Sequence, residues 1–409
     1  MKTVDEHLET ILTAIEPIDS IELGLLEAEG GVLTEDVTAS HPLPSFDNSA
    51  MDGYAVRAAD VSGATAWHPV TLPVVGEVVA GDTGAYAVIP GTAVRITTGA
   101  QLPTGADAVI PVEWTDAGDA RAGGRPPGAK VQVRRAADAG HAIRHSGEDL
   151  QAGDQVLAAG TVVGPMQIGL LAAAGRGAVR VRPRPRVAVL STGNELAEPG
   201  SPVTMGRIWD SNSFMLTAAA RQAGALAHRH GTVPDDAHEL MTTIEDELAR
   251  ADVLITSGGV SMGGVHDVVK DALSGLGSVE FSKVAMQPGM PQGFGTVGDD
   301  RTPIFTLPGN PVSAYVSFQL FVRPALSALQ GTDPQRLRTT LAVLTDPLPS
   351  PAGKRSFARA VLNGGAVTPL AGQGSHRLAA LARANALIVV PEQVERLEAG
   401  EEAEVMCLP

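Results

Sequence analysis

The chain is poor in cysteine and in aromatic residues. Its 409 residues include one cysteine, Cys407, and aromatic side chains make up 3% of the total. A single cysteine excludes an intramolecular disulfide and any zinc or iron–sulfur site built from several cysteines. It fits a reducing compartment, so we expect the protein in the cytoplasm. The scarcity of aromatic rings leaves little surface for stacking.

Positive charge is also in deficit, because 30 Lys and Arg residues face 46 Asp and Glu residues, a net charge of −16. This charge argues against nucleic acid or an anionic membrane as a partner. We find no apolar run of about 18 residues, so no membrane span is expected. The N-terminus, MKTVDEHLETIL, is acidic and unlike a signal peptide. An anionic substrate would need local positive potential to overcome the overall charge.

Apolar residues, at 44%, are numerous enough to build several cores in a chain of this length. Thr3 and Glu6 form a capping-box pattern before an apolar stripe, which predicts a helix that ends at Pro17. Strand patterns then alternate with helix patterns only in the middle of the chain. We therefore predict a multidomain α/β plus β fold, whose three-layer α/β domain has a mostly parallel sheet. The predicted segments are an N-terminal helix and first part of a linker domain (1–45), an inserted β-rich domain (46–143), the second part of the linker domain (144–181), the α/β domain (182–330) and a C-terminal barrel-like β domain (331–409).

Three glycine-containing loops follow predicted strands of the α/β segment: STGNEL after 186–190, TSGGVSMGG after 252–255 and LPGNPVSA after 304–307. The carboxyl ends of parallel strands are where open α/β sheets bind ligands. Backbone N–H groups of glycine loops and helix N-termini favour anions. None of the loops is a Walker A or dinucleotide-binding fingerprint, and one SGG alone is typical of a structural turn. Three together indicate a site for a phosphorylated ligand.

Carboxylates accompany these loops, and two explanations for them stay open. Asp210 and Asp235 each precede a predicted helix and could be N-caps, whereas carboxylates beside phosphate loops commonly hold Mg²⁺. Glu195 and Asp267 have weaker reasons to cap a helix, so they are our candidate metal ligands. In the inserted domain, Asp52 of DNSAMDGYA and Thr98 of TTGA favour structural turns on pattern alone.

Seven motifs occur in order along the chain: PSFDNSAMDGYAV, RITTGAQLPTGADAVIPVE, IRHSGEDL, VLSTGNEL, SGGVSMG, LPGNPVSA and GQGSHRLAALARANALIVV. Together they resemble the molybdopterin molybdenumtransferase family, which comprises MoeA and the gephyrin E domain. The resemblance implies an elongated four-domain homodimer whose inserted domain completes the partner's active site. It also implies that adenylylated molybdopterin and molybdate are the substrates, that AMP is released, that Mg²⁺ assists, and that the molybdopterin adenylyltransferase is a further partner.

The resemblance also implies roles for individual residues. Catalytic roles fall on Asp52, Thr98, Glu195, Asp235, Asp267 and Lys283, of which Glu195 and Asp267 would hold the metal. Binding roles for the substrate or an oxyanion fall on Arg144, Ser257, Gly258, Gly259, Ser261, Pro308, Gly309, Asn310, Pro311, Arg359 and Ser375.

The chain departs from the family pattern in two places. Where relatives often have Lys-Pro-Gly-Lys-Pro, this chain has Gln287 and Met290 at the lysine positions. Asp267 also comes one residue later than the family's acidic residue. The missing lysines favour the alternative of a non-catalytic molybdopterin-binding or scaffold protein. A third interpretation is that the protein is a nucleotidyl-transferring relative. The motifs in the β domains argue against it.

Overall fold

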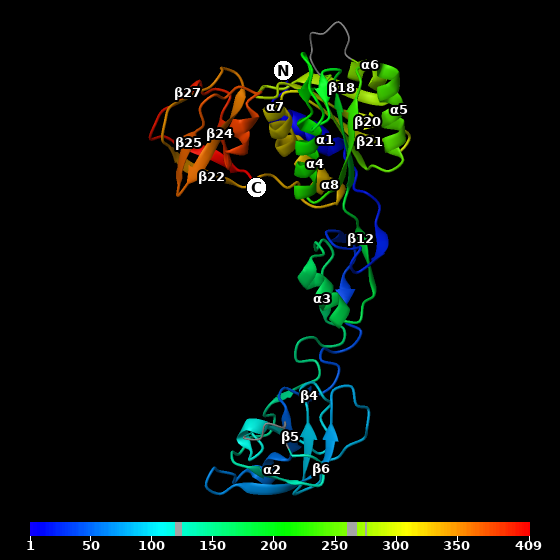
Figure 1. The fold of residues 1–409 in the computed structure, drawn as a ribbon, viewed down its shortest axis with the longest axis vertical. Helices are drawn as coiled ribbons and strands as arrows, with labels where there is room; N and C mark the ends of the chain where they lie inside the picture. Colours follow the sequence, from blue (N-terminus) through cyan, green and yellow to red (C-terminus); the bar gives the residue numbers. More distant parts are fainter. Residues whose placement is uncertain (119–124, 260–267, 275) are drawn as a thin grey trace.

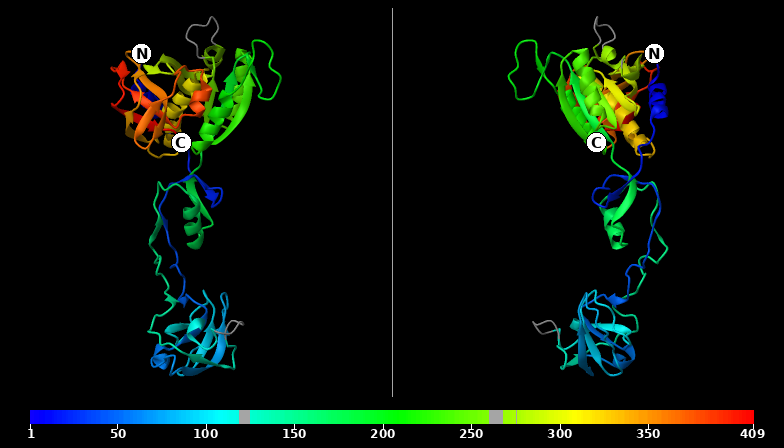
Figure 2. Two further views of the ribbon diagram at one scale, coloured as in Figure 1. Left: turned by 60° about the vertical axis from the view of Figure 1, so that its left-hand side comes forward. Right: turned by 90° about the vertical axis from the view of Figure 1, so that its right-hand side faces the viewer.

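The computed structural model describes residues 1–118, 125–259, 268–274 and 276–409. Ser261 and Asp267, two of the predicted site residues, lie outside these ranges. The molecule is elongated, with the inserted β domain at one end and the α/β and C-terminal domains together at the other (Figure 1). Two antiparallel runs of chain connect these ends through the slender linker domain (Figure 2). The predicted multidomain α/β plus β class is confirmed.

The N-terminal helix α1 (Val4–Ala14) begins with the predicted capping box. The Thr3 hydroxyl accepts from the Glu6 backbone N–H at 3.1 Å, and the Glu6 carboxylate accepts from the Thr3 N–H at 2.7 Å. Val4, Leu8 and Ile11 are buried in the core of the α/β domain. Segment 1–45 is therefore divided between the α/β domain, which its helix joins, and the linker domain, which the chain enters only after this helix.

The linker domain has a three-stranded sheet with order β1 (Ile21–Gly24), β12 (Ala178–Arg182), β2 (Val32–Leu33). Strand β3 (Val37–Thr38) pairs with β11 (Gln155–Leu157), and helix α3 (Pro165–Ala173) supports them. Leu33, Val163, Leu171 and Val181 belong to its small core.

The inserted domain holds a curled five-stranded sheet. Its order is β8 (Ala108–Pro111), β5 (Gly53–Val56), β7 (Ala93–Ile96), β6 (Val70–Val78), β9 (Lys130–Val133). The short helix α2 (Ala58–Val61) and the 3₁₀ turn η1 (Val112–Trp114) lie beside it. At its neck, β4 (Asn48–Ser49) pairs with β10 (Ile143–Arg144), so the two connecting chains are tied together where they enter.

The α/β domain has a six-stranded sheet with order β16 (Leu226–Val233), β13 (Arg186–Thr192), β17 (Val253–Ser257), β21 (Thr302–Leu307), β20 (Pro291–Val297), β18 (Gly277–Lys283). The first four strands are parallel, β20 is antiparallel to β21, and β18 is antiparallel to β20. Strand β18 therefore runs in the same direction as β21, and its end lies at the same edge of the sheet.

Helices cover both faces of this sheet, as a three-layer domain requires. One face carries α1, α4 (Asn212–Gln222), α7 (Pro311–Ser317) and α8 (Arg323–Leu329), and the other carries α5 (Ala237–Leu248) and α6 (Val268–Ser274). A segment bounded by β14 (Leu196–Ala197) and β15 (Ile208–Trp209) projects from the domain (Figure 2).

Helix α7 continues through the π-helical turn η2 (Phe318–Val322) into α8. Within the part of the chain that the structure describes, Pro311–Leu329 is the one helix that is long and apolar enough, by length and composition, to cross a membrane. Polar residues such as Gln319 and Arg323 interrupt it, so it is not the continuous apolar run whose absence the sequence indicates. Most of it, 89%, is buried inside the protein, which is typical of a core helix.

The C-terminal domain is a closed barrel of β24 (Arg355–Asn363), β25 (Ala366–Pro369), β22 (Thr339–Leu344), β28 (Glu402–Cys407) and β26 (Ala386–Val390). The pair β23 (Leu348–Pro349) and β27 (Arg396–Leu397) and helix α9 (Leu378–Ala382) complete it. Strand β19 (Met286–Gln287) from the α/β segment pairs with β24, which ties the two domains together.

His7 on α1 supplies a pH-dependent contribution to stability. Its side chain is 4% exposed and lies edge-on to Phe321, with ring centroids 4.8 Å apart. Burial, with a smaller contribution from Lys2, lowers the pKa of His7 from 6.5 to about 4. Because the unfolded chain binds more protons between these values, stability falls as pH falls through this window.

We expect His7 to reduce the free energy of unfolding by up to about 3 kcal/mol between pH 6.5 and 4. His7→Leu should remove this part of the acid destabilisation, measured by urea unfolding at a series of pH values. His68→Leu, at an exposed position, is the control and should keep the wild-type pH dependence. Parallel pH profiles for wild type and His7→Leu would contradict the assignment.

Candidate functional site

The ends of β13, β17 and β21 meet at one edge of the sheet, as their parallel register requires. Ser191 is in register with Ser257, and Ser257 with Leu307. The loops that follow enclose a cavity of about 890 Å³. The predicted residues that the structure brings to this cavity are Glu195, Asp235, Gly258, Gly259, Pro308, Gly309 and Asn310. The sheet edge at which the sequence predicts a ligand site therefore contains a cavity.

Glycine is required in the second loop for two reasons. Gly258 and Gly259 have φ values of +101° and +68°, a region that side chains rarely adopt. A Cβ on Gly258 would also lie 2.5 Å from the Thr192 carbonyl oxygen, and one on Gly259 would collide with Val269. The loop therefore presents bare backbone to the cavity.

Asn212, the first residue of α4, holds two of the loops together. Its Nδ2 donates to Ser257 Oγ at 2.8 Å and to the Gly309 carbonyl at 2.7 Å. Ser257 Oγ in turn donates to the Pro308 carbonyl at 3.4 Å. Sequence reasoning missed Asn212 because it read the residue as part of an ordinary helix. The signal available in the sequence was a polar amide at the first residue of a helix, because the start of this helix faces the strand ends.

The structure decides between capping and ligand binding for Asp210. Its buried carboxylate accepts from Ser191 Oγ at 3.0 Å, from the Ser213 backbone N–H at 3.1 Å and from Ser213 Oγ. Arg229 approaches it at 3.8 Å. Asp210 is thus a structural anchor at the start of α4.

The N-cap of α5 lies one residue later than predicted. The helix begins at Ala237, and Asp236 is its N-cap, accepting from His238 N–H at 3.0 Å and Glu239 N–H at 2.9 Å. Asp235 is not the cap. It exchanges two hydrogen bonds of 3.2 Å with Asn194, the residue before Glu195. This exchange joins the first loop to the start of α5 and holds Asp235 at the cavity.

Glu195 is exposed and lines the same cavity, as does Asp271 on α6. Carboxylates thus line one part of the wall and glycine backbone another. Among the described residues, no group of three or more His, Cys, Asp or Glu side chains is arranged to hold a metal ion. A metal bound by Glu195 and Asp267 stays a prediction.

Lys283 is the exposed last residue of β18, at the same edge of the sheet. It lies in register with Pro291, which lines the cavity. The loop between them contains Gln287 and Met290, where relatives often have lysines. Buried Gln292 fixes this loop, because its Nε2 donates to the Gly289 carbonyl at 2.5 Å and to Ser317 Oγ at 2.6 Å.

Arg359 of β24 is almost completely buried. Its guanidinium donates to the carbonyls of Gly372 and Gly374, both at 3.0 Å, and of Arg377 at 3.2 Å, and to Gln373 Oε1 at 3.3 Å. Burial lowers the pKa of Arg359. These bonds give Arg359 a structural role in bracing loop 370–377, and direct contact with an oxyanion stays a prediction.

Loop 370–377 carries Ser375 to the α/β domain. The Ser375 carbonyl accepts from the Val312 N–H at 3.0 Å, at the start of α7 and directly after Pro311. The barrel therefore meets the LPGNP loop at the edge that holds the cavity.

Three predicted residues lie far from the cavity. Asp52 Oδ1 accepts from the Thr98 N–H at 2.7 Å and from Thr98 Oγ1 at 2.9 Å, and the backbone bond chiefly lowers the pKa of Asp52. Arg144 is exposed on β10 at the neck. All three belong to the inserted domain or its neck, away from the α/β domain of the same chain (Figure 1).

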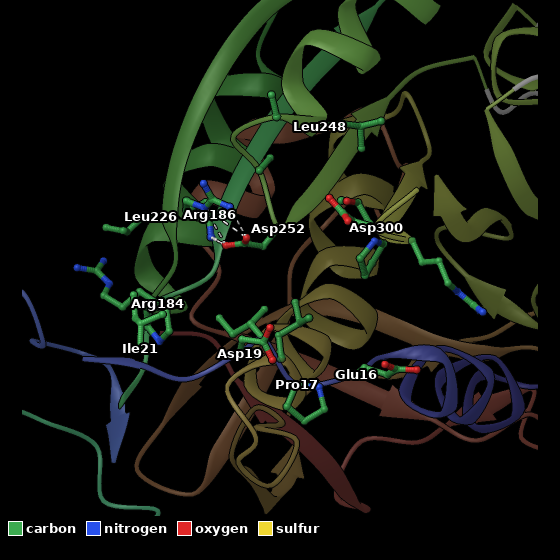
Figure 3. Close-up of a pocket in the computed structure, with 18 of the residues that line it drawn as sticks. Glu16, Pro17, Asp19, Ile21, Arg184, Arg186, Leu226, Leu248, Asp252 and Asp300 are labelled. Atoms are coloured by element: carbon green, nitrogen blue, oxygen red, sulfur yellow. Dashed lines mark hydrogen bonds and ion pairs between the residues drawn. The ribbon is translucent and has the colours of Figure 1, made fainter. Parts of the chain in front are cut away.

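A second cleft, of about 820 Å³, lies at the opposite edge of the α/β sheet, where the chain passes to and from the linker domain (Figure 3). Arg186 there pairs with Asp252 at 2.7 Å, and Arg184 donates to the Gly224 carbonyl at 2.6 Å. Its walls contain none of the three glycine loops. This cleft is part of the domain junction rather than the candidate site.

The fold and the cavity define a multidomain α/β protein with a cavity at its sheet edge, lined by glycine backbone and carboxylates. The matching family models are the MoeA N-terminal region (domain I and II) over residues 2–175, the probable molybdopterin binding domain over 188–328, and the MoeA C-terminal region (domain IV) over 341–408.

Individual known proteins are also similar to this chain over most or all of its length. Molybdopterin molybdenumtransferase 2 of Mycobacterium tuberculosis is 48% identical, with 99% of each chain covered. The Bacillus subtilis molybdopterin molybdenumtransferase is 35% identical over 92% of this chain and 87% of its own. The crystal structure of a molybdopterin biosynthesis MoeA protein from Pyrococcus horikoshii OT3 has a TM-score of 0.72 and 30% identity, with all of both chains covered. The chain belongs to the molybdopterin molybdenumtransferase (MoeA) family of enzymes of molybdenum cofactor biosynthesis.

Asn212→Asp should lower the free energy of unfolding by about 2–4 kcal/mol, because it turns a carboxylate oxygen toward the Gly309 carbonyl in a buried setting. Guanidinium unfolding measures the loss. The control is Asn363→Asp, the same change at an exposed position, which should stay within about 0.5 kcal/mol of wild type. Equal stability of the two variants would show that Asn212 does not hold the loops.

Proposed function

We propose that the enzyme inserts molybdenum from molybdate into adenylylated molybdopterin and releases AMP, with Mg²⁺ as its metal, in the cytoplasm. The observation that carries this proposal is the cavity at the sheet edge, where the backbone of Gly258, Gly259 and Gly309 lies near the carboxylates of Glu195 and Asp235. Bare glycine backbone suits a phosphate, and carboxylates suit the cation that accompanies it.

The donor set fits Mg²⁺. This ion prefers oxygen ligands and usually takes one or two protein carboxylates together with substrate phosphates. Glu195 and Asp235 supply such oxygens at one cavity, and the two hydrogen bonds exchanged with Asn194 fix the position of Asp235. When bound, Mg²⁺ supplies positive charge that offsets the charge of the pyrophosphate.

The remaining residues bind and orient the substrate. The helix that begins at Pro311 points its N-terminus at the LPGNP loop, and the positive end of its dipole favours an anion there. Lys283 supplies a cation at the same edge, and Ser375 approaches from the barrel. We infer that these groups receive the pyrophosphate and the molybdate. No side chain is proposed as a covalent nucleophile.

We further propose that the enzyme acts as a homodimer and that the partner's inserted domain completes the site. Asp52 is held toward Thr98 by two hydrogen bonds, and its lowered pKa keeps the carboxylate charged. In its own chain this pair is separated from the cavity by the linker domain (Figure 1). A second copy running the opposite way would bring it to the cavity. The molybdopterin adenylyltransferase remains our proposed further partner.

A non-catalytic molybdopterin-binding or scaffold protein is the second candidate. The feature that favours it is the loop with Gln287 and Met290, which carries no positive charge although it leads directly to Pro291 at the cavity. Such a protein would bind the substrate without releasing AMP.

The test is to incubate the purified protein with adenylylated molybdopterin, Mg²⁺ and molybdate and to follow AMP. We expect molybdate-dependent AMP release, which Glu195→Gln lowers about 100-fold because the amide cannot offset the metal's charge. Glu402→Gln, at an exposed barrel position, is the matched control and should keep wild-type activity. Substrate binding without molybdate-dependent AMP release would support the scaffold instead.

A further inference from the structure

One hydroxyl at the sheet edge has no hydrogen-bond partner within the described ranges of the chain. Thr192 ends β13, is 3% exposed and lines the cavity, and its Oγ1 is unpaired among the described residues. Its neighbours differ: Ser191 Oγ bonds Asp210, and Ser257 Oγ bonds Asn212. Because buried polar groups in native proteins are nearly always paired, this exception calls for an explanation.

The two glycines of the second loop lie directly beside this hydroxyl. A Cβ on Gly258 would lie 3.0 Å from Thr192 Oγ1, and one on Gly259 would lie 3.4 Å from it. Any other residue at either position would therefore place a side chain against the hydroxyl. With glycine at both positions, the space beside Oγ1 contains no side chain from this loop.

The position of the hydroxyl separates it from three other threonines that are unpaired among the described residues, of which Thr217 lies on α4. Thr256 and Thr306 also have unpaired Oγ1 atoms, but they are fully buried and do not line the cavity. They lie within the sheet, one residue before the ends of β17 and β21. Of the four, Thr192 alone lines the cavity walled by the glycine loops.

We propose that Thr192 is a substrate-contacting residue, whose hydroxyl donates a hydrogen bond to an anionic phosphate oxygen bound on the Gly258–Gly259 loop. The inference rests on the proposed function in that a phosphorylated ligand occupies this cavity. A hydroxyl suits the role because it can donate to an anion without adding charge beside Glu195 and Asp235. The ligand class is a phosphate ester or pyrophosphate.

The test compares Thr192→Val, Thr192→Ser and Thr256→Val in the full-length protein. AMP and inorganic pyrophosphate, each with Mg²⁺, serve as probes in isothermal titration calorimetry. Thr192→Val keeps the shape and removes the hydroxyl, so we expect affinity for at least one probe to fall about tenfold. Thr192→Ser should stay within about threefold of wild type. Thr256→Val removes an equally unpaired hydroxyl away from the cavity and should bind as wild type does.

Thermal unfolding provides a second readout. Since Thr192 Oγ1 bonds to no group in the part of the protein that the structure describes, Thr192→Val should melt at or above the wild-type temperature. A lower melting temperature for Thr192→Val than for Thr192→Ser would reveal a protein partner and overturn the inference.

The binding outcomes separate this inference from the proposed function. Equal probe affinity in wild type and Thr192→Val, or no probe binding by wild type, overturns the inference, while AMP release by wild type still decides the function. Probe binding that Thr192→Val weakens, in a protein that releases no AMP, supports the anion contact and contradicts the proposed reaction.

Discussion

The parallel register of β13, β17 and β21 is the constraint on which the rest of the site depends. It brings three strand ends, which are about 50 residues or more apart in sequence, to one edge. The loops after them then need only short-range bonds to form a cavity. Asn212 joins the second loop to the third, and the exchange between Asn194 and Asp235 joins the first loop to α5. A shift of one residue in any of these strands would separate the bonded groups.

The net charge of −16 makes local positive potential important. At the cavity, it comes mainly from backbone N–H groups and the start of α7, with Lys283 at the end of β18. Arg359 contributes less than its charge suggests, because protein carbonyls already accept from its guanidinium. Such sources act within a Debye length of about 8 Å, where they outweigh a diffuse negative field. The proposed anion binding would therefore depend on loop geometry more than on the number of cations.

Much of the fold was predictable because its signals are local. The capping box at Thr3, the strand–helix alternation and the three glycine loops each follow from neighbouring residues. The hydrogen bonds of Asn212 and Arg359 could not be predicted. The partners of Asn212 lie 45 or more residues away, and those of Arg359 lie in a loop without regular structure. The start of α5 was misplaced because Asp235 and Asp236 are equally good caps in sequence.

Two copies of the chain are central to the proposed mechanism, and a mixed dimer tests this most directly. Asp52→Ala and Glu195→Gln chains carrying different tags would be co-expressed, and the heterodimer isolated through both tags. If the inserted domain of one copy completes the cavity of the other, each heterodimer has one intact site and should show about half of the wild-type rate of AMP release. Activity no higher than that of the two single-variant proteins would contradict a site shared between chains.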